Sequence, residues 1–437
     1  MSILRAGLIC LWLEALLCCK SDALAQPVAV EPKVLQRLQE TIQQQQQQLA
    51  RQAEQIKAQA ELLRQLEQQV GTLQSQSQAQ LSSAAVTVKA EPAPVPPAEM
   101  TSGNDKISLA LSGHINRAVN VVNDGGRTSL YHVDNNADNT RIRLVGTARI
   151  SEEFTLGSWL EFVMTADDSS LVSQNSQAPG NYISTKGAEL SLSSKRFGKL
   201  SLGKGSTASD NTSAADLSRT DIVLYSSIAD IAGGILFKQK NGLLSSTSLA
   251  TAFDPLDGLG DTSRLRYDSP ALFGFVLSGS LASGQRSDLA LTWDGEGYGF
   301  QASAAFGLAN PKLSGAALQY DGSFSLLHTA SGLNLTLAGG LLDRTTGSDA
   351  TAAYAKLGWL ANLIRQGATA FGVDYAQSRD MAALGDTGRS MGGAVVQAFD
   401  RYATELYLQY RLFSLDRSAA PSVFNVNVST FGARVKF

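Results

Sequence analysis

The stretch TRIRLVGTARIS, from Thr140 to Ser151, alternates between apolar and polar residues with a period of two. Successive side chains of a β-strand point to opposite faces, so its apolar residues share one face and its arginines share the other. The same alternation recurs along the C-terminal two thirds of the chain, which predicts an all-β fold there. Clear examples are 288–293, 333–337, 405–411 and 431–437.

Two architectures fit many alternating strands: a soluble sandwich with its apolar face inside, and a membrane barrel with its apolar face outside. The apolar faces are rich in Leu, Ala and Gly and lack the bulk that a packed core needs. The strands have about 9–12 residues, the length that crosses a bilayer at a tilt. Short and long connections alternate, as in outer-membrane barrels. These three observations favour the membrane barrel.

Composition excludes other classes of protein. The 36 Lys and Arg residues nearly balance the 39 Asp and Glu residues, so the chain lacks the basic excess of a nucleic-acid-binding protein. A mean hydropathy of −0.05 is too low for a polytopic helical membrane protein. The sequence therefore predicts no nucleic-acid partner.

The N-terminus resembles an export signal. Residues 1–25 combine Arg5, a short apolar run and the small-residue cleavage pattern Ala23-Leu24-Ala25. The alternative is an uncleaved anchor. All three cysteines lie within this segment, so a mature chain beginning at Gln26 would contain no disulfide and no cysteine metal site.

Residues 31–75 carry an apolar heptad repeat that predicts a coiled coil and therefore oligomerisation. Glutamines occupy the central d positions and weaken the apolar seam, and the alternative is a disordered Gln-rich tract. Residues 76–102 lose the heptad and become a Pro/Ser-rich linker. The a positions are Leu35, Ile42, Leu49, Ile56, Leu63 and Val70.

Four segments resemble the trimeric general porins of Gram-negative outer membranes. They are NTRIRL with WLEF (139–144 and 159–162), RFGKLSLG (196–203), RLRYDSP followed by GF (264–270 and 274–275), and the terminal Phe437. The resemblance covers residues 103–437. It implies an outer-membrane β-barrel, a long third loop that folds inward, and a terminal aromatic residue that the insertion machinery reads.

With this resemblance as a guide, the alternating segments give sixteen antiparallel transmembrane strands and a long constriction loop at about 206–261. If 233–250 formed a hairpin in the wall, the count would be eighteen. The sixteen expected strands are 106–121, 139–151, 154–165, 181–193, 198–205, 262–269, 272–283, 288–294, 298–307, 314–328, 333–343, 353–361, 368–378, 390–400, 404–413 and 427–437.

The resemblance also implies a channel narrowed between loop carboxylates and wall arginines. Opposite charges that face each other across a narrow passage create a transverse field that favours polar solutes. Arginine on the lipid face at mid-membrane would cost about 2–4 kcal/mol, so the wall arginines point inward. The predicted constriction residues are Arg141, Arg143, Arg149, Arg264 and Arg266 on the wall and Asp210, Asp216 and Asp221 on the loop.

No motif for catalysis is evident. The chain has three histidines, His114, His132 and His328, which are far apart in sequence, and it lacks a Gly-x-Ser-x-Gly elbow, a His-Glu-x-x-His motif and a P-loop. The acidic segment 134–138 lacks the EF-hand spacing and is expected to be an exposed loop. We therefore expect no enzyme activity, no catalytic residue, no metal site and no cofactor.

The sequence thus predicts an outer-membrane porin that passes small hydrophilic solutes and ions by passive diffusion. We expect a homotrimer in contact with outer-membrane lipid, with its coiled coil in the periplasm and a possible cell-wall contact of that arm. Two alternatives stay open. One is a channel selective for small anions, and the other is a structural tether between the outer membrane and the cell wall.

Overall fold

The computed structural model describes residues 100–104, 106–313 and 315–437, together with four isolated helical residues in the N-terminal region. The predicted signal peptide, the heptad segment apart from those four residues, and the linker up to residue 99 lie outside the described part. The four residues are Gln43, Glu54, Lys57 and Glu61.

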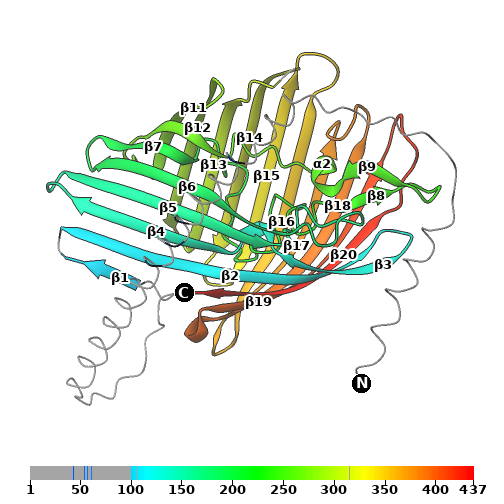
Figure 1. The fold of residues 1–437 in the computed structure, drawn as a ribbon, viewed down its shortest axis with the longest axis horizontal. Helices are drawn as coiled ribbons and strands as arrows, with labels where there is room; N and C mark the ends of the chain where they lie inside the picture. The colour runs from blue at the N-terminus through cyan, green and yellow to red at the C-terminus, as the bar shows by residue number, and fades with distance from the viewer. Residues whose placement is uncertain are drawn as a thin grey trace. The chain divides into compact units, whose positions relative to one another are not determined.

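Sixteen antiparallel strands form the wall of a closed barrel (Figure 1). Each pairs with its neighbour along the chain, and the last pairs with the first. This confirms the predicted barrel and strand count, and most predicted bounds agree within three residues. The wall strands are β2 (Ile107–Asn123), β4 (Arg141–Arg149), β5 (Phe154–Ala166), β6 (Asn181–Ser194), β7 (Gly198–Ser206), β10 (Asp261–Asp268), β11 (Phe275–Ala282), β12 (Arg286–Gly297), β13 (Phe300–Asn310), β14 (Ala316–His328), β15 (Leu333–Arg344), β16 (Ala350–Ile364), β17 (Gly367–Arg379), β18 (Thr387–Phe399), β19 (Thr404–Asp416) and β20 (Val426–Lys436).

The barrel closes between β2 and β20, where His114 to Asn123 pair with Lys436 to Asn427. The terminal Phe437 extends this seam by exchanging two backbone hydrogen bonds with Gly113, at 2.7 and 2.9 Å. Both barrel termini therefore lie at one end of the barrel, which we call the terminal end. The opposite, loop end carries the long connections, including 167–180, 207–260 and 417–425.

The wall presents apolar side chains outward and polar side chains inward. On β12, Leu289 and Leu291 are exposed on the outside, whereas Asp288 is buried inside. Strand alternation makes this arrangement possible, and a bilayer favours it because lipid replaces water around the outer face.

One wall position is filled by two consecutive strands. The part of β2 nearer the loop end, Arg117–Asn123, pairs with β3 (Thr128–Asp134). The part nearer the terminal end, Ile107–His114, pairs with β4. Between them, residues 135–140 leave the wall and include the short 3-10 helix η1 (Asn136–Asp138). The expected exposed loop at 134–138 is therefore wrong: Asp134 and Asn135 are almost fully buried.

Three short strands lie outside the sixteen. β1 (Met100–Gly103) pairs with β2, so strand structure begins three residues before the predicted barrel boundary. β8 (Leu236–Lys238) and β9 (Leu244–Ser248) form a separate two-stranded sheet. The eighteen-strand alternative is wrong, because this hairpin belongs to the third loop and not to the wall.

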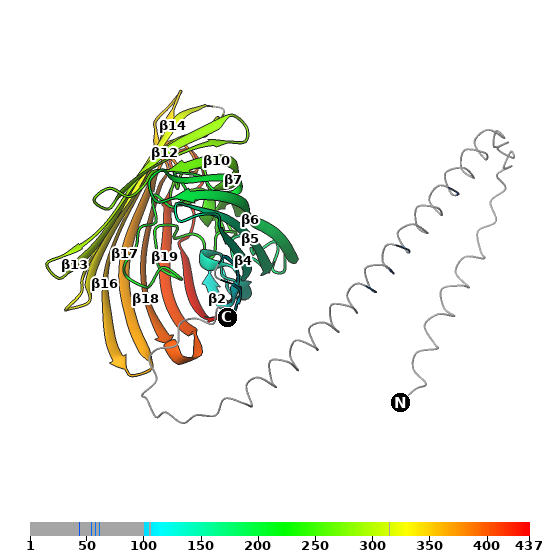
Figure 2. The same cartoon turned by 90° about the vertical axis from the view of Figure 1, so that its left-hand side faces the viewer.

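The third loop, residues 207–260, folds into the barrel and packs against the inner face of the wall (Figure 2). Its segment 222–237 is apolar, and Ile222, Leu224 and Phe237 are at most 2% exposed. Burying such a side chain stabilises the fold by about 1.5–3 kcal/mol. The loop also contains the short helix α2 (Leu249–Ala252), after which the Phe253 ring lies 5.2 Å from that of Phe413 on β19.

No helix among the described residues is long and apolar enough to cross a membrane.

Candidate channel constriction

A continuous row of alternating charges crosses the inner face of the wall around the closing seam. Each member forms an ion pair with the next, and the row passes from β5 and β4 through the inserted η1 to β20 and β19. We call it the charged ladder. Its members in spatial order are Arg143, Glu161, Arg141, Asp138, Arg434, Glu405 and Lys436.

Wall carboxylates hold the predicted wall arginines of β4. Glu161 is fully buried and accepts from Arg143 Nε at 2.5 Å and from Arg141 Nη1 at 3.1 Å. Asp138 binds Arg141 at 2.5 Å on one side and Arg434 on the other. The arginines therefore do not form a purely positive surface.

Arg143 is the predicted arginine of the ladder that remains most accessible. Its side chain is 44% exposed, against 11% for Arg141. The Arg143 guanidinium lies 5.9 Å from the ring centre of Trp159, a distance at which a cation and an aromatic face attract each other. Arg149 is exposed on β4 and forms no ion pair with any described residue.

The other two predicted wall arginines bind the base of the third loop. Arg264 is almost fully buried, pairs with Glu189 and donates from Nε to the Ser206 carbonyl at 2.9 Å. Arg266 donates to the Thr207 carbonyl at 2.6 Å and pairs with Asp268. These contacts fix the point at which the loop leaves β7.

A buried lysine fixes the loop further along. Lys356 Nζ, on β16, pairs with Asp216 and donates to Ser218 Oγ at 2.7 Å, Thr220 Oγ1 at 3.1 Å and the Leu224 carbonyl at 2.8 Å. We call these four acceptors the Lys356 cage. The Lys356 side chain is 0% exposed, so the cage replaces all of its water.

The cage positions the tip of the loop. Ser218 and Thr220 are fully buried because both face Lys356, whereas Arg219 between them is exposed. Arg219 has a φ of 59°, a left-handed conformation that costs a non-glycine residue about 1–3 kcal/mol. Asp221 follows and is also exposed. The structure thus directs this neighbouring pair of opposite charges away from the buried cage.

The loop also carries carboxylates with raised pKa values. Burial and the nearby Asp261 and Asp257 raise the pKa of Asp210 to about 6. Burial likewise raises the pKa of Asp230 to about 6, although its hydrogen bond from Tyr225 opposes the shift. Both groups are partly exposed, so they change charge near neutral pH while in contact with solvent.

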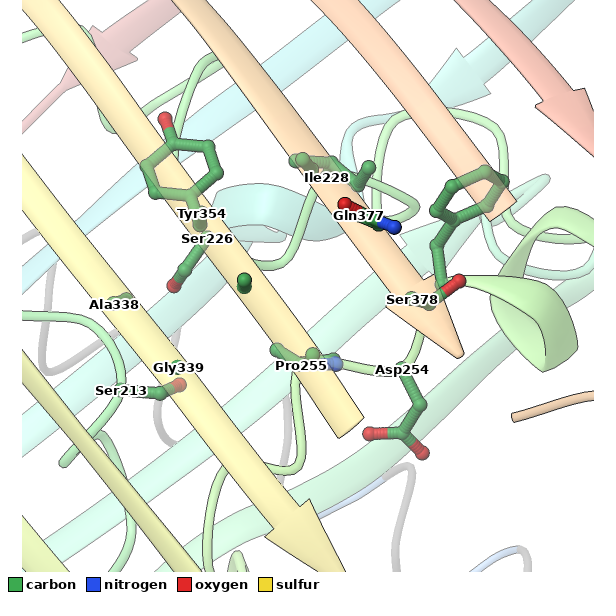
Figure 3. Close-up of a pocket in the computed structure, with 14 residues that line it drawn as sticks. Ser213, Ser226, Ile228, Asp254, Pro255, Ala338, Gly339, Tyr354, Gln377 and Ser378 are labelled. Carbon is green, nitrogen blue, oxygen red and sulfur yellow. The ribbon is translucent and has the colours of Figure 1, made fainter. Parts of the chain in front are cut away.

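The contact between loop and wall includes one small space (Figure 3). It lies against β15, β16 and β17 and has a volume of about 20 Å³, enough for a water molecule but not for a solute. The hydroxyl groups of Ser213, Ser226 and Tyr354 border it and bind no other described residue. This space is part of the loop packing.

Sequence reasoning missed several residues of this arrangement. Lys356 is a lone lysine in an alternating strand, and no local motif reveals that its partners lie 132–140 residues away. The sequence predicts an exposed loop for Asp138, because the departure of 135–140 from the wall has no periodic signal. Arg434 and Glu405 fall on the inward-facing parity of their strands, so strand alternation alone indicates that both side chains face the channel.

No three His, Cys, Asp or Glu side chains gather as a possible metal site in the described ranges. The charged groups instead pair with one another and border open space. Such an arrangement can orient and pass charged or polar solutes.

Comparison with known proteins agrees with this geometry. The family model described as Gram-negative porin matches residues 79–420. No curated protein matches.

Solved structures share the fold at low sequence identity. The anion-selective porin from Comamonas acidovorans is 15% identical, with 76% of this chain and 100% of that chain covered and a TM-score of 0.52. The trimer form of OmpT from Vibrio cholerae is 14% identical, with 76% and 100% covered and a TM-score of 0.51. OmpF of Salmonella typhi, in complex with daunomycin, is 13% identical, with 77% and 100% covered and a TM-score of 0.50. With the family match and the inward-folded loop, these findings show that the chain belongs to the Gram-negative porin family and forms an outer-membrane channel for the passive diffusion of small solutes.

Proposed function

We propose that the charged ladder and the Arg219–Asp221 tip border the narrowest part of this channel. The observation that carries the proposal is the Lys356 cage, which turns the tip away from the loop packing. Of the predicted constriction residues, Arg141, Arg143 and Asp221 then border the passage. Arg264, Arg266 and Asp216 act indirectly by holding the loop, and Asp210 contributes charge near its base. Arg149 contributes a positive charge to the channel interior at a point away from the third loop.

The proposed channel selects weakly between ions. The ladder contains four cationic and three anionic side chains that alternate along the wall. Because adjacent opposite charges cancel beyond a few ångströms in salt solution, neither ion meets a large barrier. Small neutral solutes are then separated by size.

A channel selective for small anions is the second candidate. The excess of one cation in the ladder favours it, as does the exposure of Arg143. Reversal potentials under a salt gradient distinguish the two. A permeability ratio within a few-fold of one supports the weakly selective channel, and a strong anion preference supports the second candidate.

We also propose a homotrimer, with the terminal end of each barrel facing the periplasm. The support is the trimer named for the similar OmpT structure and the heptad at 31–75, which needs partner helices. The proposal includes cleavage of residues 1–25 and a periplasmic coiled coil.

Swelling of proteoliposomes in neutral sugars of increasing size tests the channel itself. The proposal predicts swelling rates that fall steadily with sugar size and do not saturate with concentration. Swelling no faster than in protein-free liposomes would refute it.

A further inference from the structure

A cavity of about 330 Å³ lies between the loop tip and the terminal-end part of the wall from β16 to β20. Its volume falls within the range of about 300–1,000 Å³ that is typical of small-molecule sites. It is distinct from the water-sized space in Figure 3, because no residue lines both.

One side of this cavity is charged. Arg219 and Asp221 come from the loop tip, and neither forms an ion pair with any residue in the described ranges. Asp400, which opens the short helix η2 (Asp400–Tyr402), is exposed and also has no ion-pair partner there. Lys436 lines the same side of the cavity. Its side chain is 34% exposed and forms an ion pair with Glu405. The cavity thus offers cations and anions within one small volume.

The other side is apolar, which is unusual for the inner wall of a water-filled channel. Leu360, Ala370, Val396 and Ala398 face inward here, and Ile222 of the loop joins them. Val396 and Ala370 are buried under the loop, while Leu360 stays partly exposed. A fully hydrated solute gains nothing from such a surface, whereas an aliphatic group does.

We propose that this cavity is a binding site for a small zwitterion with an aliphatic side chain, such as a neutral amino acid. Arg219 and Lys436 bind its carboxylate, Asp221 and Asp400 bind its ammonium group, and Leu360 with Ala398 contacts its side chain. The inference deepens the proposed channel function and rests on it.

Charge chemistry excludes the simpler ligands. A dicarboxylate would bring one of its groups against Asp221, Asp400 or Glu405, and a diamine would meet Arg219, Arg434 or Lys436. Like charges within one small cavity repel strongly where water is partly excluded. A zwitterion satisfies both signs at once.

The tip is also preorganised for binding. The Lys356 cage holds Ser218 and Thr220, so the backbone of Arg219 between them is already fixed before a ligand binds. A fixed binding group loses less entropy on association than a mobile one.

Single-channel current through the full-length protein in a planar bilayer tests the site. Four probes are titrated from the terminal end: L-leucine, glycine, succinate and 1,4-diaminobutane. We expect leucine to reduce the current saturably, glycine to act about tenfold more weakly because it lacks the aliphatic contact, and the other two to have no saturable effect.

Three variants separate the contributions. Arg219→Asn removes the charge with a residue that tolerates the left-handed conformation, and it should weaken leucine block about tenfold or more. Leu360→Ser should reduce leucine block to the level of glycine block. The matched control is Arg127→Asn, the same change on an exposed arginine in the turn between β2 and β3, which should leave leucine block unchanged.

The outcomes separate the two proposals. Conducting channels that leucine does not block, or that succinate or diaminobutane blocks equally well, would overturn the zwitterion site and leave the channel function standing. Equal loss of block in the Arg127 control would also overturn the site. Folded protein that conducts no current would instead overturn the channel proposal.

Discussion

Lys356 on the wall and Asp216 in the third loop form an ion pair from which water is excluded, although 140 residues separate them. The same ammonium group binds Ser218 and Thr220, which flank the exposed Arg219. One wall lysine therefore determines both where the loop is fixed and which of its side chains face open space.

Breaking this ion pair should loosen the loop without removing the barrel. Lys356→Met leaves Asp216 as an uncompensated buried charge, which typically costs about 3–5 kcal/mol. We expect noisier open-channel current and a lower temperature of unfolding, measured from the mobility shift of the heated protein on SDS gels. The double variant Asp216→Asn with Lys356→Met removes both charges and should recover most of the lost stability. If the single variant were as quiet and as stable as the wild type, the cage would not fix the loop.

Neutralising Glu161 should favour anions. Glu161→Gln removes the negative charge that pairs with both Arg141 and Arg143, so their positive charges are less well compensated. The reversal potential in a KCl gradient should shift toward chloride permeation, and Arg143→Gln should shift it the opposite way. The variant carrying both changes should return close to the wild-type value. A shift toward potassium in Glu161→Gln would contradict the ladder as part of the ion path.

Ion selectivity should also depend on pH. Asp210 and Asp230, each with a pKa of about 6, lose negative charge as the pH falls from 7.5 to 5. The ratio of cation to anion permeability should therefore fall with a midpoint near pH 6. Because the folded loop binds more protons than an unfolded chain between about pH 4 and 6, its packing should become less stable as the pH rises through that window. The variant Asp210→Asn with Asp230→Asn should flatten the profile, and a ratio that rises on acidification would count against these assignments.

The closing seam should tolerate no side chain at Gly113. A Cβ there would lie 2.5 Å from the Arg141 carbonyl oxygen and 2.9 Å from the Phe437 ring. We expect Gly113→Ala to reduce the yield of folded barrel, since such crowding costs about 1–3 kcal/mol. Gly297→Ala on β12 is the matched control, because no atom lies within 4 Å of the added carbon. Equal yields for both variants would mean that the seam adjusts.

Strand periodicity made the wall predictable. The alternation around Ile142 and Leu144 is local, so it needs no knowledge of distant partners. The count of sixteen needed the porin resemblance as a guide as well, and the structure confirms that count. The wall arginines of β4 were also expected to face inward for a local reason, the cost of a charge in lipid.

Long-range partners made the loop unpredictable. Asp216 was expected to face the channel, yet it pairs with Lys356, and Arg264 pairs with Glu189 and the loop base. The pattern of β10 shows that Arg264 faces inward but not what it meets there. The insertion that brings Asp138 to Arg434 likewise interrupts a strand without any periodic signal.

The most direct test of the central claim is the ionic current of the purified full-length protein in a planar bilayer under a salt gradient. The account predicts a water-filled channel with a linear current–voltage relation, a permeability ratio within a few-fold of one, and conductance that closes in three equal steps if the barrel is trimeric. Folded protein that inserts but carries no current would contradict the channel and would favour the structural tether.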